Sequence, residues 1–297
     1  MARYGLPIAY TLLLWWLSTA LILYLDGLPR RTFVWSMAGA TALLAVALWG
    51  LVETGGSVTA TGAYLAFACG LLAWGWQLVS FYMGYVTGPR KTACAPDWVG
   101  WRRFVEAVRT SLYHELTVVV TAAAMLALTW RQPNQIALWT FVALWWMHQS
   151  AKLNVFFGVP NLGEELLPPH LRYLLSYMTR KPMNLLFPVS VSLSTVLTVL
   201  LAQKAAAADA TPFEAAGFTM LATLMALAIA EHWFLVAPLQ TNALWRWGVK
   251  AMPAPGVGAV DSSDPALLST DVREPVRSHR SGVEPWSEPL PALVCDP

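Results

Sequence analysis

The chain has 297 residues, of which 57% are hydrophobic and only 12% are charged. Soluble domains carry about 25% charged residues, so this composition is typical of a protein embedded in lipid and does not indicate nucleic-acid binding. The net charge of +2 says little about partners. The three cysteines, Cys69, Cys94 and Cys295, are too far apart to predict a disulfide framework or a zinc site.

Seven apolar runs are long enough to predict membrane-spanning helices, because about 20 apolar residues cross the hydrocarbon core. The runs are roughly 6–25, 32–51, 59–86, 111–130, 135–157, 185–203 and 213–237. Lipid cannot satisfy free backbone groups, so each run must be helical. The first run is too long for a cleaved signal peptide and is interpreted as a retained span. We therefore predict an all-α integral membrane protein with a bundle of about seven transmembrane helices.

The basic residues predict the orientation of this bundle. With seven spans, the two sides of the membrane receive very different numbers of Lys and Arg. One side receives Arg30, Arg31, Arg90, Lys91, Arg102, Arg103, Arg109, Arg172, Arg180, Lys181, Arg246 and Lys250, and the other receives Arg3, Arg131 and Lys204. Cytoplasmic loops carry the excess of basic residues. This places the N-terminus outside and the C-terminus in the cytoplasm.

Residues 1–250 are expected to form one polytopic membrane domain, and 251–297, rich in Pro, Ser and charge, a flexible cytoplasmic tail. Within the membrane domain, 97–115 and 171–181 each place apolar residues at helical spacing opposite polar ones. In the first stretch, Arg103 falls on the polar side. Both stretches predict short amphipathic helices on the cytoplasmic surface. The alternative is that they extend the spans and pack on the bundle.

The fifth span contains WWMHQSAKLN, which places His148, Lys152 and Asn154 in an otherwise apolar run. A charge at the bilayer centre costs about 2.5–3.5 kcal/mol on insertion scales, so such residues usually have a structural or functional reason. Lys152 can extend its stem to the membrane surface, or it can pair with a carboxylate. At a similar predicted depth, the candidate partners are Glu115 in the fourth span and Glu231 in the seventh.

Further titratable groups lie on the same side: Glu164, Glu165 and His170 in the loop after the fifth span, and His114 and His232 beside the two carboxylates. His114, His148 and His232 are candidate axial ligands for a bacteriochlorophyll-type tetrapyrrole. The alternative is an interhelical network of hydrogen bonds and ion pairs. No metal-ligand spacing or catalytic motif is present, so no metal site and no catalytic residue are predicted, and the cofactor stays open.

One block of the sequence resembles a known family. Its pieces are PNQ (133–135), SAKLN (150–154), GVPN (158–161), EE (164–165), LP (167–168), HLRYL (170–174) and MNLLFP (183–188). This block, about 60 residues long, resembles the PuhE family, photosynthetic complex assembly protein 2 of purple-type phototrophic bacteria. The sequence departs from that family at His148, where Arg is common, and this favours a cation that faces Glu115 or Glu231 over a ligand at this position.

The resemblance implies a multi-pass protein of the bacterial inner (photosynthetic) membrane that helps to assemble reaction-centre and light-harvesting complexes, or supplies bacteriochlorophyll to them. Its partners would be photosynthetic subunits or pigment-synthesis proteins. Our hypothesis is that Lys152 and Asn154 anchor a structured loop that carries Asn161, Glu164, Glu165, His170 and Arg172, with Glu115 or Glu231 as the partner of Lys152. The alternatives are a membrane enzyme acting on a tetrapyrrole or isoprenoid, and a stoichiometric subunit of the reaction-centre complex.

Overall fold

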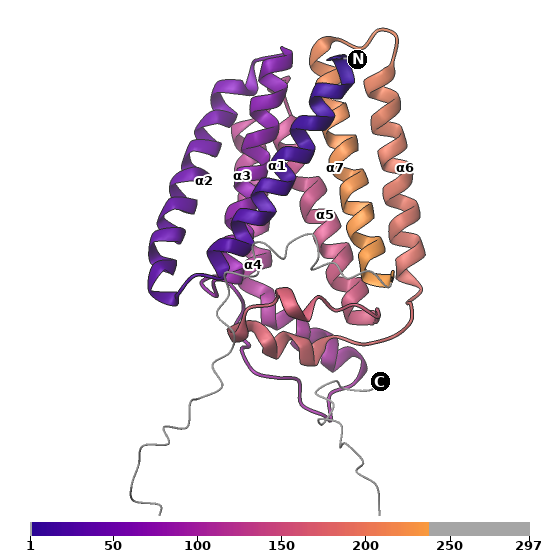
Figure 1. The fold of residues 1–297 in the computed structure, drawn as a ribbon. Helices are drawn as coiled ribbons and strands as arrows, with labels where there is room; N and C mark the ends of the chain where they lie inside the picture. The colour runs from indigo at the N-terminus through magenta and orange to yellow at the C-terminus, as the bar shows by residue number, and fades with distance from the viewer. Residues whose placement is uncertain (1, 238–297) are drawn as a thin grey trace, which may run out of the picture. The chain divides into compact units, whose positions relative to one another are not determined.

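A computed structural model of the chain describes residues 2–237, which form a bundle of long helices (Figure 1). The tail predicted from residue 251 lies outside the described residues. The long helices are α1 (Ala2–Asp26), α2 (Phe33–Gly55), α3 (Ala60–Tyr82), α4 (Gly100–Leu128), α5 (Ile136–Phe157), α6 (Leu186–Ala206) and α7 (Pro212–Val236). The short 3-10 helices are η1 (Arg30–Thr32), η2 (Glu164–Leu166) and η3 (Pro169–Tyr177).

The predicted all-α membrane fold class is confirmed. Among the described residues, six helices are long and apolar enough to cross a membrane. They are all of the long helices except α5. At a rise of 1.5 Å per residue, α5 is about 33 Å long, which also suffices to cross the hydrocarbon core. Its lower hydropathy comes from the polar residues of MHQSAKLN. The polar composition of α5, and not its length, therefore distinguishes it from the other long helices.

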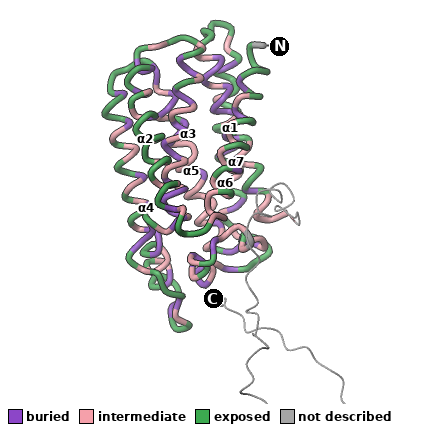
Figure 2. The backbone as a smooth tube through the Cα atoms, turned by 60° about the vertical axis from the view of Figure 1, so that its left-hand side comes forward, coloured by how far each residue is buried: buried purple, intermediate pink, exposed green. Residues whose placement is uncertain are grey.

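Burial divides the bundle into inner and outer helices. In the most apolar stretches of α3 and α7, 56% of the residues are buried, compared with 11% in α1, α2 and α6. The core that joins the inner helices includes Phe67, Phe141, Met220 and Leu224. Exposed residues run along the outer faces (Figure 2), and many of them are large and apolar. Such outer faces suit contact with lipid, because lipid tails accept apolar side chains that water would not.

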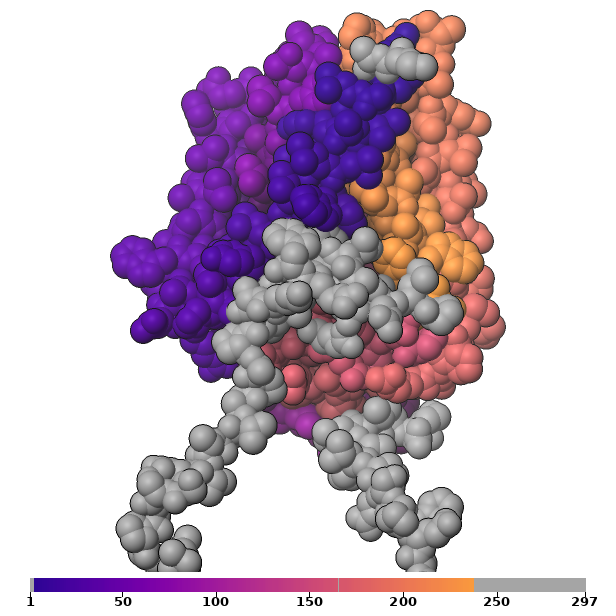
Figure 3. All heavy atoms as spheres, in the orientation of Figure 1, coloured from indigo at the N-terminus to yellow at the C-terminus, as the bar shows by residue number. Residues whose placement is uncertain are grey.

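Small residues let the inner helices approach closely. A Cβ atom on Gly70 of α3 would lie 2.5 Å from the carbonyl oxygen of Ala137 in α5, and one on Gly217 of α7 would lie 2.5 Å from the side chain of Ile136. Close backbone approach increases van der Waals contact between helices, which is a main source of helix association in lipid. On the outer side, α1 crosses the bundle beside α7 (Figure 3).

The first predicted amphipathic helix is not a separate element. Residues 100–115 form the beginning of α4, a single helix of 29 residues, so the alternative of an extended span applies. Trp101, Val105 and Val108 are exposed, whereas Arg103, expected on the polar side, is 7% exposed. The prediction for Arg103 was wrong because helical periodicity does not reveal that residues 177–179 fold back against this face.

The second predicted amphipathic segment overlaps η3, whose Leu171 and Leu174 pack against Phe81 at the end of α3. This helix, η2 and the segment 83–99 lie at one end of the bundle, where α5 ends and α4 begins (Figure 1). We call it the basic end, because its elements carry Arg30, Arg31, Arg90, Lys91, Arg102, Arg103, Arg109, Arg172, Arg180 and Lys181. At the opposite end, the connections 56–59, 129–135 and 207–211 are short.

Candidate functional site

An ion pair joins α5 to α4 near the basic end. Lys152 Nζ lies 2.5 Å from Glu115 Oε1 and 3.4 Å from Ser111 Oγ, and Gln149 donates to the other oxygen of the same carboxylate. The side chains of Lys152 and Glu115 are only 29% and 23% exposed. The carboxylate therefore neutralises the ammonium inside the bundle, where an isolated charge would be costly. Of the two candidate partners, the structure pairs Lys152 with Glu115.

Two imidazoles pack edge to face next to this ion pair. The ring centroids of His114 and His148 are 5.9 Å apart, and the rings of Phe81 and Trp74 pack against them at 4.9 and 5.4 Å respectively. His114 is fully buried. Within residues 2–237, neither of its ring nitrogens has a hydrogen-bond partner. Nε2 of His148 also lacks a partner among these residues. Buried polar groups without a partner are uncommon and need an explanation.

These unpaired nitrogens allow a test of the tetrapyrrole hypothesis. An axial ligand needs a free ring nitrogen, which His114 and His148 supply. The macrocycle also needs space beside that nitrogen, and an aromatic ring packs against each of the two imidazoles. An axial role would require these rings to move aside, and the tetrapyrrole hypothesis stays a prediction. Within the part of the chain that the structure describes, no group of three or more His, Cys, Asp or Glu residues is arranged to hold a metal ion.

The other two candidates, at the end of α7, have partners of their own. Glu231 Oε1 accepts a hydrogen bond of 3.1 Å from Trp15 Nε1. His232 has Nδ1 2.9 Å from the carbonyl oxygen of Ala228 and Nε2 2.9 Å from Ser150 Oγ. Because both ring nitrogens of His232 are engaged, it could act as a ligand only by losing a hydrogen bond. Its contacts instead connect α7 to α5.

Asn154 holds the end of α5 in place, as the loop hypothesis requires. It is fully buried, and its Nδ2 donates to Ser190 Oγ in α6 at 3.1 Å. Asn184 extends this link: its Nδ2 donates to the carbonyl oxygens of Asn154 and Gly158, at 3.1 and 2.9 Å, and its Oδ1 caps the first turn of α6. Lys152 takes no part in these contacts. Its side chain points across to Glu115 in α4, one of the two partners expected for it, and its part in anchoring the loop stays a prediction.

The loop after α5 is fastened to the end of α7. Asn161 Nδ2 donates to the carbonyl oxygens of Phe234 and Ala237, at 2.9 and 2.6 Å, and its backbone N–H donates to that of Leu235 at 3.1 Å. These bonds satisfy carbonyls that a helix end leaves without partners. Arg180 closes the loop by binding the Glu164 carboxylate. The structure leaves Arg172 exposed and does not describe the side chain of Glu165.

His170 connects η3 to the end of α3. Its Nε2 lies 2.8 Å from the carbonyl oxygen of Tyr82, and its ring faces Phe33. Burial lowers the pKa of His170 below its usual value, the hydrogen bond to Tyr82 opposes this, and the positive charges of Arg30 and Lys91 lower the pKa further. The neutral imidazole is therefore favoured in the folded protein.

This shift predicts a pH dependence of stability. A His whose pKa is lower in the folded state stabilises the fold most above its unfolded pKa, about 6.5, and loses that contribution as the pH falls below this value. We expect the melting temperature of the wild type to fall more steeply than that of His170→Gln between about pH 7.5 and 5. Thermal unfolding in detergent at several pH values measures both. Parallel curves for the two proteins would contradict the assignment.

The described geometry can now be compared with known proteins. The sequence model of the family DUF3623, described as a protein of unknown function, matches residues 1–255. The chain belongs to this family. A Rhodobacter capsulatus relative, described as an uncharacterized 30.4 kDa protein in the puhA 5′ region, is 35% identical to this DUF3623 chain over 249 residues, which cover 82% of the chain and 90% of the relative. No solved structure matches.

Several residues that hold this DUF3623 fold together were not among the candidates. Besides Asn184 and Arg103, they include Gln77 of α3, which donates to Thr121 of α4 at 2.8 Å and accepts from Thr117 at 3.0 Å. Two signals could have found them. Gln77 is a polar residue within an apolar run, and Asn184 precedes a helix, where Asn commonly acts as a cap.

Proposed function

We propose that the chain is a membrane factor for the assembly of bacterial photosynthetic complexes, or for the supply of bacteriochlorophyll to them. The observation that carries this proposal is the 35% identity to a Rhodobacter capsulatus protein, across 90% of its length, whose gene lies beside puhA. In the PuhE family that the loop sequence resembles, the neighbouring gene encodes the reaction-centre H subunit. The position of the relative in the puhA 5′ region supports a related role for this chain.

The geometry favours an assembly factor over an enzyme. Several polar side chains near the basic end are engaged in contacts within the fold: Lys152 with Glu115, Asn161 with the backbone of α7, and Arg103 with residues 177–179. A general acid or base must instead reach a substrate. These contacts hold the segment 158–185 in place and leave Arg172 exposed. This arrangement suits a surface that contacts a nascent photosynthetic subunit or a pigment-synthesis protein.

The proposed orientation places the N-terminus on the periplasmic side of the inner membrane and the basic end on its cytoplasmic side. The gathering of basic residues at one end supports it, because the cytoplasmic side of a membrane protein carries the excess of Lys and Arg. A periplasm-specific reporter enzyme fused to the N-terminus should be active. The same reporter inserted in the loop 83–99 should be inactive, and the reverse pattern would overturn the orientation.

Deletion of the gene in a phototrophic host tests the assembly role. We expect weaker near-infrared bands of the reaction-centre and light-harvesting complexes, with chemically normal bacteriochlorophyll in solvent extracts and recovery on complementation. A chemically altered tetrapyrrole or isoprenoid would instead favour the membrane-enzyme alternative. Copurification with the reaction centre at a constant ratio would favour a stoichiometric subunit. Complexes of normal yield would refute the assembly role.

A spectrum of the purified protein tests pigment binding separately. Because aromatic rings pack against both His114 and His148, we expect the protein to be colourless after purification in mild detergent. A bacteriochlorophyll band at a constant ratio to protein would contradict this expectation. In that case, substitution of His114 and of His148 would show which imidazole is the ligand.

A further inference from the structure

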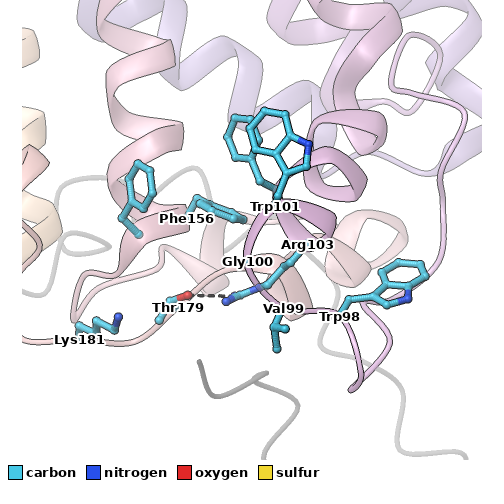
Figure 4. Close-up of a pocket in the computed structure, with 10 residues that line it drawn as sticks. Trp98, Val99, Gly100, Trp101, Arg103, Phe156, Thr179 and Lys181 are labelled. Carbon is cyan, nitrogen blue, oxygen red and sulfur yellow. Dashed lines mark hydrogen bonds between the residues drawn. The ribbon is translucent and has the colours of Figure 1, made fainter.

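A pocket of about 460 Å³ lies at the basic end, between the beginning of α4 and the end of α5 (Figure 4). Aromatic side chains form much of its wall, and two basic residues, Arg103 and Lys181, line it as well. The aromatic residues include Trp101, Phe104, Phe156 and Phe157. None of the described residues that line the pocket is acidic. Aromatic walls combined with positive charge suggest a ligand that is apolar at one end and anionic at the other.

The charge of Arg103 is not neutralised within the described part of the chain. Its Nη2 donates to the carbonyl oxygens of Tyr177 and Met178 and to Thr179 Oγ1, at 2.9, 3.2 and 2.9 Å (Figure 4 shows the bond to Thr179). Its Nε is buried and has no hydrogen-bond partner among residues 2–237. Arg103 is only 7% exposed, and no carboxylate of the described residues pairs with it. A buried cation of this kind is stabilised by an anion nearby.

Two further positive features face the same pocket. Lys181 packs its stem against Gly158, and no described carboxylate pairs with its ammonium. The helix α4 begins at Gly100, which lines the pocket, and it has neither a side-chain cap nor an acidic residue in its first turn. The first N–H groups of a helix lack partners within it and favour anions. Asp97, the acidic residue closest in sequence to Gly100, pairs with Arg102, and neither of these two residues lines the pocket.

The apolar side of the pocket is continuous with the outer face of the bundle. Trp101 is 76% exposed, and Val105 and Val108, one and two turns further along α4, are 36% and 39% exposed. This stripe runs from the pocket along the side of a membrane-spanning helix. Trp residues prefer the boundary between headgroups and acyl chains. A lipid whose chain follows the stripe would therefore place its headgroup between Arg103 and Lys181.

We propose that this pocket binds the phosphate headgroup of an anionic phospholipid from the leaflet at the basic end. The positive charge of Arg103, Lys181 and the first turn of α4 favours a headgroup whose phosphate charge is not balanced by a cation of its own, and Trp101 with the stripe beyond it favours an acyl chain. Arginine suits phosphate because its planar guanidinium presents donors in a fork. The proposal is independent of the photosynthetic role, since it rests on the geometry of the pocket alone.

Native mass spectrometry of the full-length protein, with added phosphatidylglycerol or phosphatidylcholine of the same acyl chains, tests the proposal. We expect tighter retention of phosphatidylglycerol. Lys181→Met should weaken its binding about fivefold, because one basic residue near a membrane surface contributes about 1 kcal/mol to anionic-lipid binding. Lys181 is exposed, so this substitution should leave the fold intact. Lys91→Met is the matched control, since Lys91 is exposed at the same end but does not line the pocket.

A second variant separates lipid from soluble phosphate. Trp101→Ala should weaken the binding of phosphatidylglycerol and leave any competition by inorganic phosphate unchanged. Equal retention of the two lipids, or equal effects of Lys181→Met and Lys91→Met, would overturn the proposal. Binding of inorganic phosphate with no dependence on acyl chains would overturn the assignment to a lipid.

Discussion

Replacing Lys152 with Met is expected to lower the free energy of unfolding of the detergent-solubilised protein by about 1–3 kcal/mol. The substitution leaves the Glu115 carboxylate largely buried, with Gln149 but no cation beside it. A carboxylate in that position either remains charged without compensation or takes up a proton, and both lower the stability of the folded state. Reversible unfolding by denaturant or heat in detergent, with intrinsic Trp fluorescence as the readout, measures the loss.

A double-mutant cycle separates the ion pair from other effects of the substitution. Glu115→Gln should also destabilise the protein, because it leaves the Lys152 ammonium without its counter-charge. The double variant should be more stable than the sum of the two losses predicts, since it removes both charges together. Lys204→Met, at an exposed basic position at the opposite end, is the control for the loss of a lysine. Additive losses would show that the two side chains do not interact.

The same variants connect the ion pair to the proposed function. If the basic end contacts a photosynthetic subunit, Lys152→Met should lower the yield of complexes by more than it lowers the amount of protein in the membrane. Lys152 lies near that end and connects α5 to α4, so its loss should disturb the position of the loop that follows α5. A fall in complex yield no larger than the fall in the amount of protein in the membrane would argue against a role for this contact.

The helices were predictable because lipid imposes a simple rule. A run of about 20 apolar residues must be helical to satisfy its backbone, and turn formers interrupt the runs. Six of the seven runs correspond to helices with nearly the predicted bounds, and α4 is the exception. Its first three turns carry polar residues, such as Arg102 and Glu106, that lie beyond an apolar run, so hydropathy underestimated its length.

The sequence predicted the level in the bundle at which the candidate residues lie, but not the helix toward which each side chain points. Topology placed Lys152, Glu115 and Glu231 at a similar level of the bundle, and this left two partners open. The choice depends on how each helix is rotated about its axis, which packing between helices determines. In the structure, α5 turns Lys152 toward α4, and Glu231 meets Trp15 of α1 instead. A single sequence does not contain that rotation.

Contacts between distant loops were beyond the sequence altogether. Arg103 binds residues that follow it by more than 70 positions, and Asn161 binds the end of α7 at a similar separation. Local patterns carry information about spacing along a helix but none about which loop folds back on it. Arg103 was therefore assigned to the polar side of a surface helix, although the segment 177–179 covers it.

Asn134→Ala is expected to destabilise the protein by about 2–3 kcal/mol, although this residue carries no charge and lies in the short connection between α4 and α5. Its side-chain Nδ2 lies within hydrogen-bond distance of the carbonyl oxygens of Thr54, Ser57 and Gly62, at 3.1, 3.2 and 3.1 Å. Its Oδ1 accepts from the backbone N–H of Ile136 at 3.2 Å. One buried side chain thus joins the ends of α2, α3 and α5, and alanine would leave several of these backbone groups without a partner.

Thermal unfolding in detergent measures this loss, with Gln203→Ala, an exposed amide at the same end of the bundle, as the matched control. A change similar to that of the control would contradict the role of Asn134. The variant also tests where the function lies. Asn134 is at the end opposite to the proposed contact surface, so its substitution should lower complex yield only in proportion to the amount of folded protein. If Asn134→Ala lowered complex yield by more than the amount of folded protein, the partner surface would lie at the opposite end. If its fall in yield were proportional while that of Lys152→Met exceeded the loss of folded protein, the partner surface would lie at the basic end.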